Sequence, residues 1–94
     1  MKIDVTEEHI ALGKGGRAGE CPIALACNQA GLSYAGVGYR SLSFFDKSVM
    51  VILDLPLEAK LFVNHFDRYW AGVSKDPPKP FSFELDWSGP INKD

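Results

Sequence analysis

The stretch 41-SLSFFDKSVMVILDLPLEAKLFVNHFDRYW-70 joins two strand patterns, a turn and a helix pattern in one run. Asp46 and Lys47 stand between two segments rich in β-branched and aromatic residues, which predicts a hairpin turn. From Pro56 the apolar residues change to helical spacing, so residues 56–70 predict an amphipathic helix. Its predicted buried stripe consists of Ala59, Phe62, Val63, Phe66 and Tyr69 or Trp70. Strands next to such a helix predict an α+β protein.

The segment before this run adds a strand and a helix. Residues 33–39 (SYAGVGY) form a strand pattern that its glycines weaken, and whether residues 33–45 make one strand or two stays open. Residues 21–31 predict a helix that begins at Cys21 and Pro22 and ends at Gly31. Its predicted buried stripe is Ile23, Ala26, Cys27 and Ala30.

The two ends of the chain complete the predicted domain. Residues 2–5 read as a short strand, and residues 6–13 as a short helix with Thr6 as N-cap and Val5 and Ile10 as a hydrophobic staple. Prolines make residues 74–80 a stiff extended connector, and the strict alternation of residues 81–87 (FSFELDW) predicts a half-buried antiparallel strand. We expect a frayed tail at residues 88–94.

These elements add up to a single small α+β domain over residues 1–94, in the order β-α-α-β-β-α-β. The expected architecture is an antiparallel sheet of three to four strands, with two or three helices packed on one face.

Composition limits the classes of function. The chain has 94 residues, of which 46% are hydrophobic and 23% charged, as in ordinary folded proteins. A net charge of -2 gives no general attraction to nucleic acid or to anionic membranes. No apolar run approaches the length of a membrane span, and the N-terminus lacks the apolar core of a signal peptide. We therefore expect a cytoplasmic protein that does not bind membranes.

The glycine-rich segment 13–19 (GKGGRAG) contains two cations, Lys14 and Arg17. Glycine amides beside cations suit an anion, but the lysine of a phosphate-binding P-loop directly follows its last glycine, and here Glu20 does. A dinucleotide fingerprint also follows a strand, whereas this segment follows a predicted helix. We expect a flexible loop that contacts a partner. The alternative is a nucleotide- or nucleic-acid-binding module that uses Gly13–Gly19.

The two cysteines raise a chemical alternative. A thiol at a helix N-terminus can have a lowered pKa, and Arg17 would act in the same direction, so a thiol-dependent activity at Cys21 is a third hypothesis. Cys27 is predicted to lie in the core. Six residues of helix separate the two thiols too far for a disulfide, and neither the cysteines nor the histidines have metal-ligand spacing. We expect no enzyme, no catalytic residue, no metal and no cofactor.

Aromatic residues are the remaining candidates for recognition. Burial is favoured for most of them, and five have the best chance of exposure: Tyr34, Tyr39, Phe45, Tyr69 and Trp70. An exposed aromatic patch rimmed by Lys or Arg is typical of a protein interface or of a surface that stacks single-stranded nucleic acid. The predicted partner contacts are Lys14, Arg17, Tyr34, Tyr39, Arg40, Tyr69 and Trp70.

The order VTEEHI..G, CPIALA, LPLEAKLFVNHFD and P..FSFELD resembles a family of small uncharacterised proteins from bacteriophages, prophages and other bacterial mobile elements. The resemblance runs from Val5 to about Asp86. Many members carry a second cysteine just before the CP pair, which GRAGECP lacks, so a role that needs both thiols does not transfer.

The resemblance implies a setting and no established activity. It suggests a non-catalytic accessory protein that binds a host macromolecule, such as an inhibitor of a bacterial defence system like CRISPR. The expected partner is a host protein complex in the bacterial cytoplasm. Nucleic acid is disfavoured as the partner, and the oligomeric state stays open.

Overall fold

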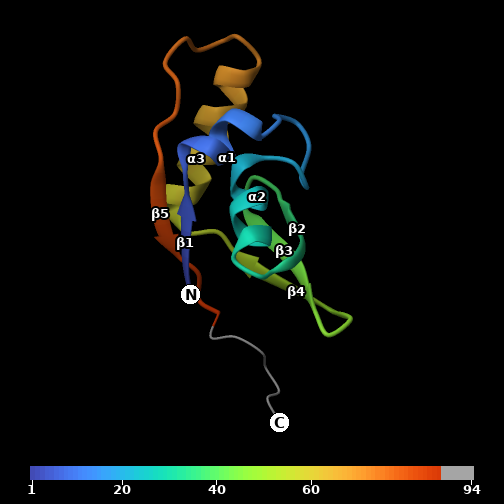
Figure 1. Ribbon diagram of the computed structural model, residues 1–94. Helices are drawn as coiled ribbons and strands as arrows, with labels where there is room; N and C mark the ends of the chain where they lie inside the picture. The colour runs from blue at the N-terminus through green and yellow to red at the C-terminus, as the bar shows by residue number, and fades with distance from the viewer. Residues whose placement is uncertain (88–94) are drawn as a thin grey trace.

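The computed structural model describes residues 1–87 and shows one small α+β domain with three helices and five strands (Figure 1). In chain order the elements are β1 (Lys2–Val5), α1 (Glu7–Leu12), α2 (Pro22–Gln29), β2 (Ser33–Val37), β3 (Ser41–Asp46), β4 (Val49–Asp54), α3 (Leu57–Trp70) and β5 (Phe81–Glu84). The α+β class is confirmed. None of the helices within residues 1–87 has the length and apolarity needed to cross a membrane.

The strands form two antiparallel sheets where the sequence suggested one. The first pairs β1 with β5, so that Lys2 lies opposite Glu84 and Val5 opposite Phe81. The second has the order β2-β3-β4. Residues 33–46 therefore form two strands, which answers the question the sequence left open. Alternation identifies strands but does not say which of them pair, and β1 and β5 come from opposite ends of the chain.

Helix α2 lies between the two sheets and packs against both β1 and β2 (Figure 1). Its small residues Ala24, Ala26 and Cys27 are almost fully buried, which permits this close approach. The predicted stripe is wrong at Ala30, which is exposed because it is the C-cap and lies beyond the last helical turn. Helix α3 covers the first sheet, where Phe62 stacks on Phe81 with ring centroids 4.7 Å apart.

The N-terminal turn of α1 links this helix to α2. Thr6 is the N-cap as predicted, and Val5 is buried while Ile10 packs against the core. A capping box is completed by His9, whose Nδ1 accepts the Thr6 backbone N–H at 3.0 Å. The other ring nitrogen, Nε2, is therefore free to carry the proton that it donates to Gln29 Oε1. The buried His9 is thus a structural residue.

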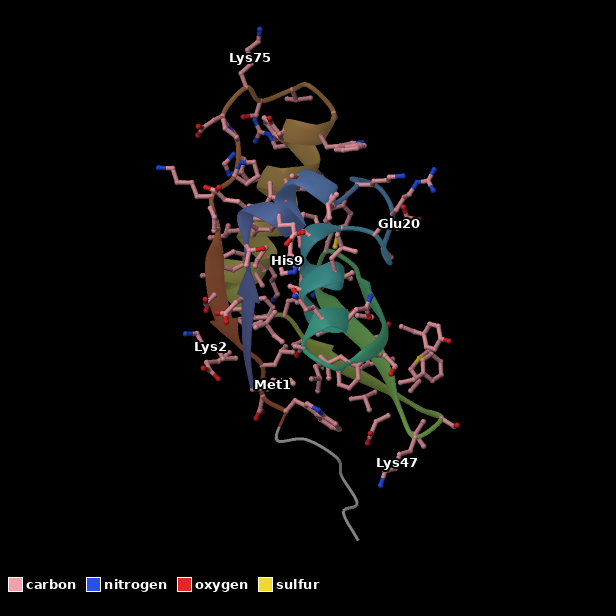
Figure 2. All side chains as sticks on the ribbon, in the orientation of Figure 1. Met1, Lys2, His9, Glu20, Lys47 and Lys75 are labelled. Atoms are coloured by element: carbon pink, nitrogen blue, oxygen red, sulfur yellow. The ribbon has the colours of Figure 1, made fainter. Side chains whose placement is uncertain are left out.

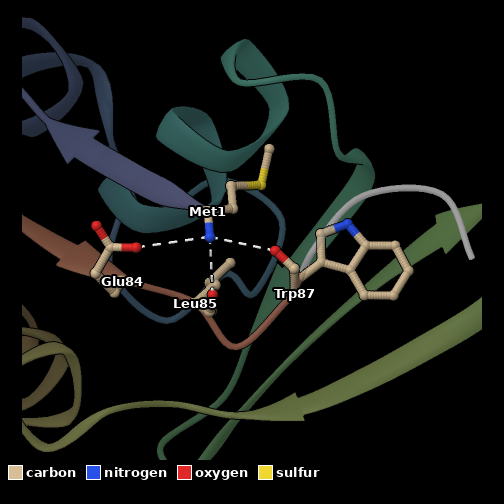
Figure 3. Close-up of polar contacts among 4 residues, drawn as sticks. All are labelled: Met1, Glu84, Leu85 and Trp87. Atoms are coloured by element: carbon tan, nitrogen blue, oxygen red, sulfur yellow. Dashed lines mark hydrogen bonds and ion pairs between the residues drawn. The ribbon is translucent and has the colours of Figure 1, made fainter.

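The first residue is tied to the segment after β5 (Figure 3). The Met1 amino group donates hydrogen bonds to the carbonyl oxygens of Leu85 (3.0 Å) and Trp87 (3.2 Å) and lies 3.6 Å from Glu84 Oε1. The Trp87 ring meets Phe44 edge-on, with centroids 5.2 Å apart. Trp87 therefore connects the first sheet with the inner face of the second. The tail predicted at residues 88–94 lies outside the described residues.

Candidate functional site

The face of the second sheet that points away from the core carries a cluster of exposed apolar side chains next to the polar residues Ser41, Ser43 and Asp54. In the β3–β4 register Leu42 and Phe44 point inward, so Phe45 and its cross-strand neighbour Met50 point outward, as does Ile52. We call the following set the outer face, with exposed fractions in parentheses: Tyr34 (84%), Phe45 (39%), Met50 (54%) and Ile52 (64%). Solvent-facing sheet positions are normally polar, so this composition is unusual.

Tyr34 is held on the outer face by a strained backbone. Its φ of 54° lies in the left-handed region, which costs a non-glycine residue roughly 1–2 kcal/mol. The strain sits in the irregular register of β2 between Ser33 and Gly36, and the Ala35 amide donates to Asn28 Oδ1 at 2.9 Å there. The Tyr34 ring then meets Phe45 edge-on, with centroids 6.4 Å apart. The strained backbone thus presents the Tyr34 ring to solvent and not to the core.

The β3–β4 hairpin adds a cation to the edge of this face. Lys47 and Ser48 both have positive φ, 52° and 69°, the combination required by a type I′ two-residue turn. Lys47 therefore lies at the hairpin tip, at the opposite end of the molecule from Lys75 (Figure 2). An open pocket of about 420 Å³ lies beside the turn, and it is lined by Ser33, Tyr34, Phe45, Lys47 and Ser48. An aromatic patch next to a lysine matches the kind of interface predicted above.

Strand β4 is an edge strand within the described residues 1–87, because β3 is its only neighbour there. The Leu55 amide donates to the Arg40 carbonyl on the β3 side, which fixes the alternation. Odd-numbered residues of β4 therefore bond toward β3, and the backbone groups of Met50 and Ile52 point to the free side. Proteins usually protect such an edge with lysine, proline or a bulge, and residues 49–53 (VMVIL) contain none of these.

The exposed apolar surface is large for a domain of this size. A large side chain offers roughly 200 Å² when fully exposed, so the outer face presents about 500 Å². Patches of that size on small proteins are commonly functional. The outer face is therefore the strongest candidate site.

The glycine-rich segment differs from the flexible cationic loop that the sequence predicted. Glu20 lies 3.8 Å from Lys14 Nζ and 3.5 Å from Arg17 Nη1, so one carboxylate partly neutralises both cations. Backbone hydrogen bonds join Lys14 to Glu20 and Val37 to Ala18. A Cβ added at Gly15 would lie 2.7 Å from the Trp70 ring, so the loop is packed against α3.

Two other predicted contacts lie next to this loop. Arg17 and Tyr39 line a cleft of about 210 Å³ together with Asp67, and Arg40 is exposed in the following turn. Asp67 and the nearby Glu20 place carboxylates where an anion would need positive charge. The arrangement therefore does not favour a phosphate ligand.

Tyr69 and Trp70 belong to a third surface. Both are exposed rather than buried, and they line a groove of about 540 Å³ between α1, α3 and the connector residues 76–80. Stacking on Phe66 and contact with Gly15 give Trp70 a structural role as well. The structure thus exposes all five aromatic candidates but separates them. Tyr34 and Phe45 share the outer face, Tyr69 and Trp70 share the groove, and Tyr39 lies at the cleft. Sequence reasoning missed Met50 and Ile52, the neighbours of Phe45 on the outer face.

The two cysteines lie in the core. Both are free and buried. Burial raises the pKa of the Cys21 thiol despite hydrogen bonds from the Ala24 and Ile23 amides, so the predicted lowering is wrong. Burial raises the pKa of Cys27 to about 12. Within residues 1–87, no three His, Cys, Asp or Glu side chains are grouped to hold a metal ion.

Comparison with known proteins gives no match to a family model, a curated protein or a solved structure. The resemblance to small phage proteins therefore stays a prediction.

Proposed function

We propose that this protein is a non-catalytic binding module that docks on a partner protein through the outer face of its three-stranded sheet. One observation carries the proposal: a strained backbone presents Tyr34 to solvent beside Phe45, Met50 and Ile52. Aromatic residues with adjacent aliphatic side chains are the usual centre of protein interfaces.

The charges favour a protein over a nucleic acid as the partner. Among the described residues, Lys47 is the cation that lines the pocket on the outer face, whereas a phosphate backbone needs a row of cations. Lys14 and Arg17 lie in a different loop and share Glu20. The partner surface that fits is apolar with a carboxylate placed to meet Lys47.

The phage resemblance suggests which partners to test first. We propose a bacterial defence complex, such as a CRISPR effector, in the bacterial cytoplasm, with the protein acting by covering a surface that the complex needs. This identity rests on the resemblance, and the docking surface rests on the geometry.

The outer face is tested with the double variant Tyr34→Ser, Phe45→Ser. Its matched control is Leu57→Ser, Leu61→Ser, which removes two leucines that are 68% and 60% exposed on α3. Each protein is assayed for binding to purified CRISPR effector complexes and for restoring phage infection in a host with active CRISPR immunity. We expect the outer-face variant to lose at least about 100-fold in affinity, as for loss of two central aromatic contacts, and the control to bind normally.

A second measurement locates the interface directly. A photo-crosslinking amino acid at position 34 should capture the partner, and the same group at position 57 should not. Equal capture at both positions, or full activity of the Tyr34→Ser, Phe45→Ser variant, would exclude the outer face. Loss of binding on Trp70→Ser alone would assign the interface to the groove between α1 and α3.

A further inference from the structure

We propose that two copies of this chain associate edge to edge through β4 into one six-stranded antiparallel sheet, with Val51 on the two-fold axis. The inference goes beyond the proposed function and does not depend on it. It commits to a second copy as the occupant of the free edge of β4.

The backbone of β4 is arranged for this pairing. The groups of Met50 and Ile52 that point away from β3 are an N–H and a C=O from each residue. In an antiparallel pair centred on Val51, Met50 of one copy lies opposite Ile52 of the other. The two pairs related by the axis then form four backbone hydrogen bonds, so the free donors and acceptors of both edges are satisfied.

The side chains select this register. Centred on Val51, the outer-face pairs are Met50 with Ile52 and the inner-face pairs are Val49 with Leu53, so every residue from 49 to 53 meets an apolar neighbour. Moving the centre to Ile52 would place Asp54 opposite Met50. Moving it to Met50 would place Lys47 opposite Leu53. A two-fold axis that passed between two residues would pair each outer-face residue of one copy with an inner-face residue of the other. Such a register does not fit a sheet in which both outer faces lie on the same side.

The exposed side chains supply the favourable energy. Val49, Met50 and Ile52 are each more than half exposed in the single chain, and pairing covers part of each. The same association joins two outer faces into one surface of at most about 1000 Å², less the area of Met50 and Ile52 that the pairing covers. Each side of a standard protein complex buries roughly 800 Å². The dimer therefore provides an interface of ordinary size where one copy provides about 500 Å².

Cysteine cross-linking tests the register. In the proposed dimer the two Val51 residues form a non-hydrogen-bonded pair with Cα atoms about 4.5 Å apart, within disulfide range. The two Leu53 residues are separated by four residues of strand, roughly 14 Å. We expect Val51→Cys to form a covalent dimer on mild oxidation and Leu53→Cys to stay monomeric. Native Cys21 and Cys27 are buried and give little background.

Sedimentation equilibrium tests the association without cross-linking. From about 1 to about 500 µM protein, the apparent mass should rise from 10.3 kDa toward twice that value. Ile52→Pro removes an N–H on the free side and leaves the β3 ladder intact, so it should abolish the dimer while circular dichroism stays unchanged. The matched control Ile52→Thr keeps the N–H. We expect its dimer dissociation constant to be at least about tenfold lower than that of Ile52→Pro.

The outcomes separate this inference from the proposed function. Tyr34→Ser, Phe45→Ser should still dimerise, because β4 is untouched, even though partner binding is lost. Loss of the dimer in that variant would indicate face-to-face packing of two outer faces and overturn edge pairing. A single-chain mass at all concentrations, or cross-linking of Leu53→Cys in place of Val51→Cys, would also overturn it, and neither result changes the outcome of the Tyr34→Ser, Phe45→Ser binding test.

Discussion

At position 34, glycine should stabilise the fold more than alanine does. Tyr34 has a φ of 54°, and alanine would keep the left-handed cost of roughly 1–2 kcal/mol while glycine would remove it. Against this gain, glycine gives the unfolded chain about 0.5–1 kcal/mol of extra conformational freedom. The net expectation is that Tyr34→Gly is about 1 kcal/mol more stable than Tyr34→Ala, which is about 4–8 °C in Tm for a domain of this size.

Urea unfolding followed by tryptophan fluorescence measures this difference, since Trp70 and Trp87 both report on packed regions. The control is Ala11→Gly at an exposed position inside α1. There glycine should lower the free energy of unfolding by about 1 kcal/mol relative to alanine. If the alanine variant at position 34 proves as stable as the glycine variant or more so, the backbone there is not strained. Both variants lack the ring, so we expect both to lose partner binding alike.

Three further predictions concern the turn, the loop and the core. Lys47→Asn with Ser48→Gly should stabilise the protein by about 1 kcal/mol in urea unfolding, since both positions have positive φ. Gly15→Ala should destabilise it by about 1–3 kcal/mol, because the new Cβ would lie 2.7 Å from an indole ring. For Cys27, whose folded pKa of about 12 exceeds the unfolded value of 9.0, stability should be full below pH 9 and fall above it, by about 1.4 kcal/mol per pH unit.

The loop and core predictions have controls, and the turn prediction has an outcome that would contradict it. Gly19→Ala should be nearly neutral, because the nearest atom to its new Cβ is 3.8 Å away. A turn variant less stable than wild type would contradict the type I′ assignment. For the thiol, Cys27→Ala should flatten the loss of stability above pH 9 relative to wild type. An equal slope in both proteins would show that other groups cause it.

Local signals in the sequence predicted most elements of this fold. Thr6 and Pro22 mark helix starts, and the alternation from Phe81 to Trp87 predicts correctly which of these residues are buried. The predicted strand over residues 81–87 is too long, because β5 ends at Glu84. The division into two sheets could not be predicted, because the pairing of β1 with β5 depends on contacts across almost the whole chain. Local sequence patterns contain no information about contacts between residues so far apart in the chain.

The candidate site was predicted only in part, for a related reason. Tyr34 and Phe45 were singled out as aromatic residues with a chance of exposure. Met50 and Ile52 were missed because the run VMVIL has the composition of a fully buried strand, and only the tertiary structure shows β4 at an edge. The loop prediction failed at Gly15, whose partner Trp70 lies far along the chain.

The pairing of β1 with β5 affects how the chain folds during synthesis on the ribosome. Lys2 pairs with Glu84, and the Met1 amino group donates to the Trp87 carbonyl oxygen, so residues 1–5 gain their partners only after residues 81–87 have been synthesised. The β2–β4 hairpins can form early because their partners are near neighbours in the chain, whereas β1 must remain unpaired until residue 87 has left the exit tunnel. During that interval the apolar side chains Ile3 and Val5 lack their native cover. We therefore expect the nascent chain to be most exposed to chaperones and proteases at residues 2–5, and to gain protection there only after residues 81–87 have left the exit tunnel.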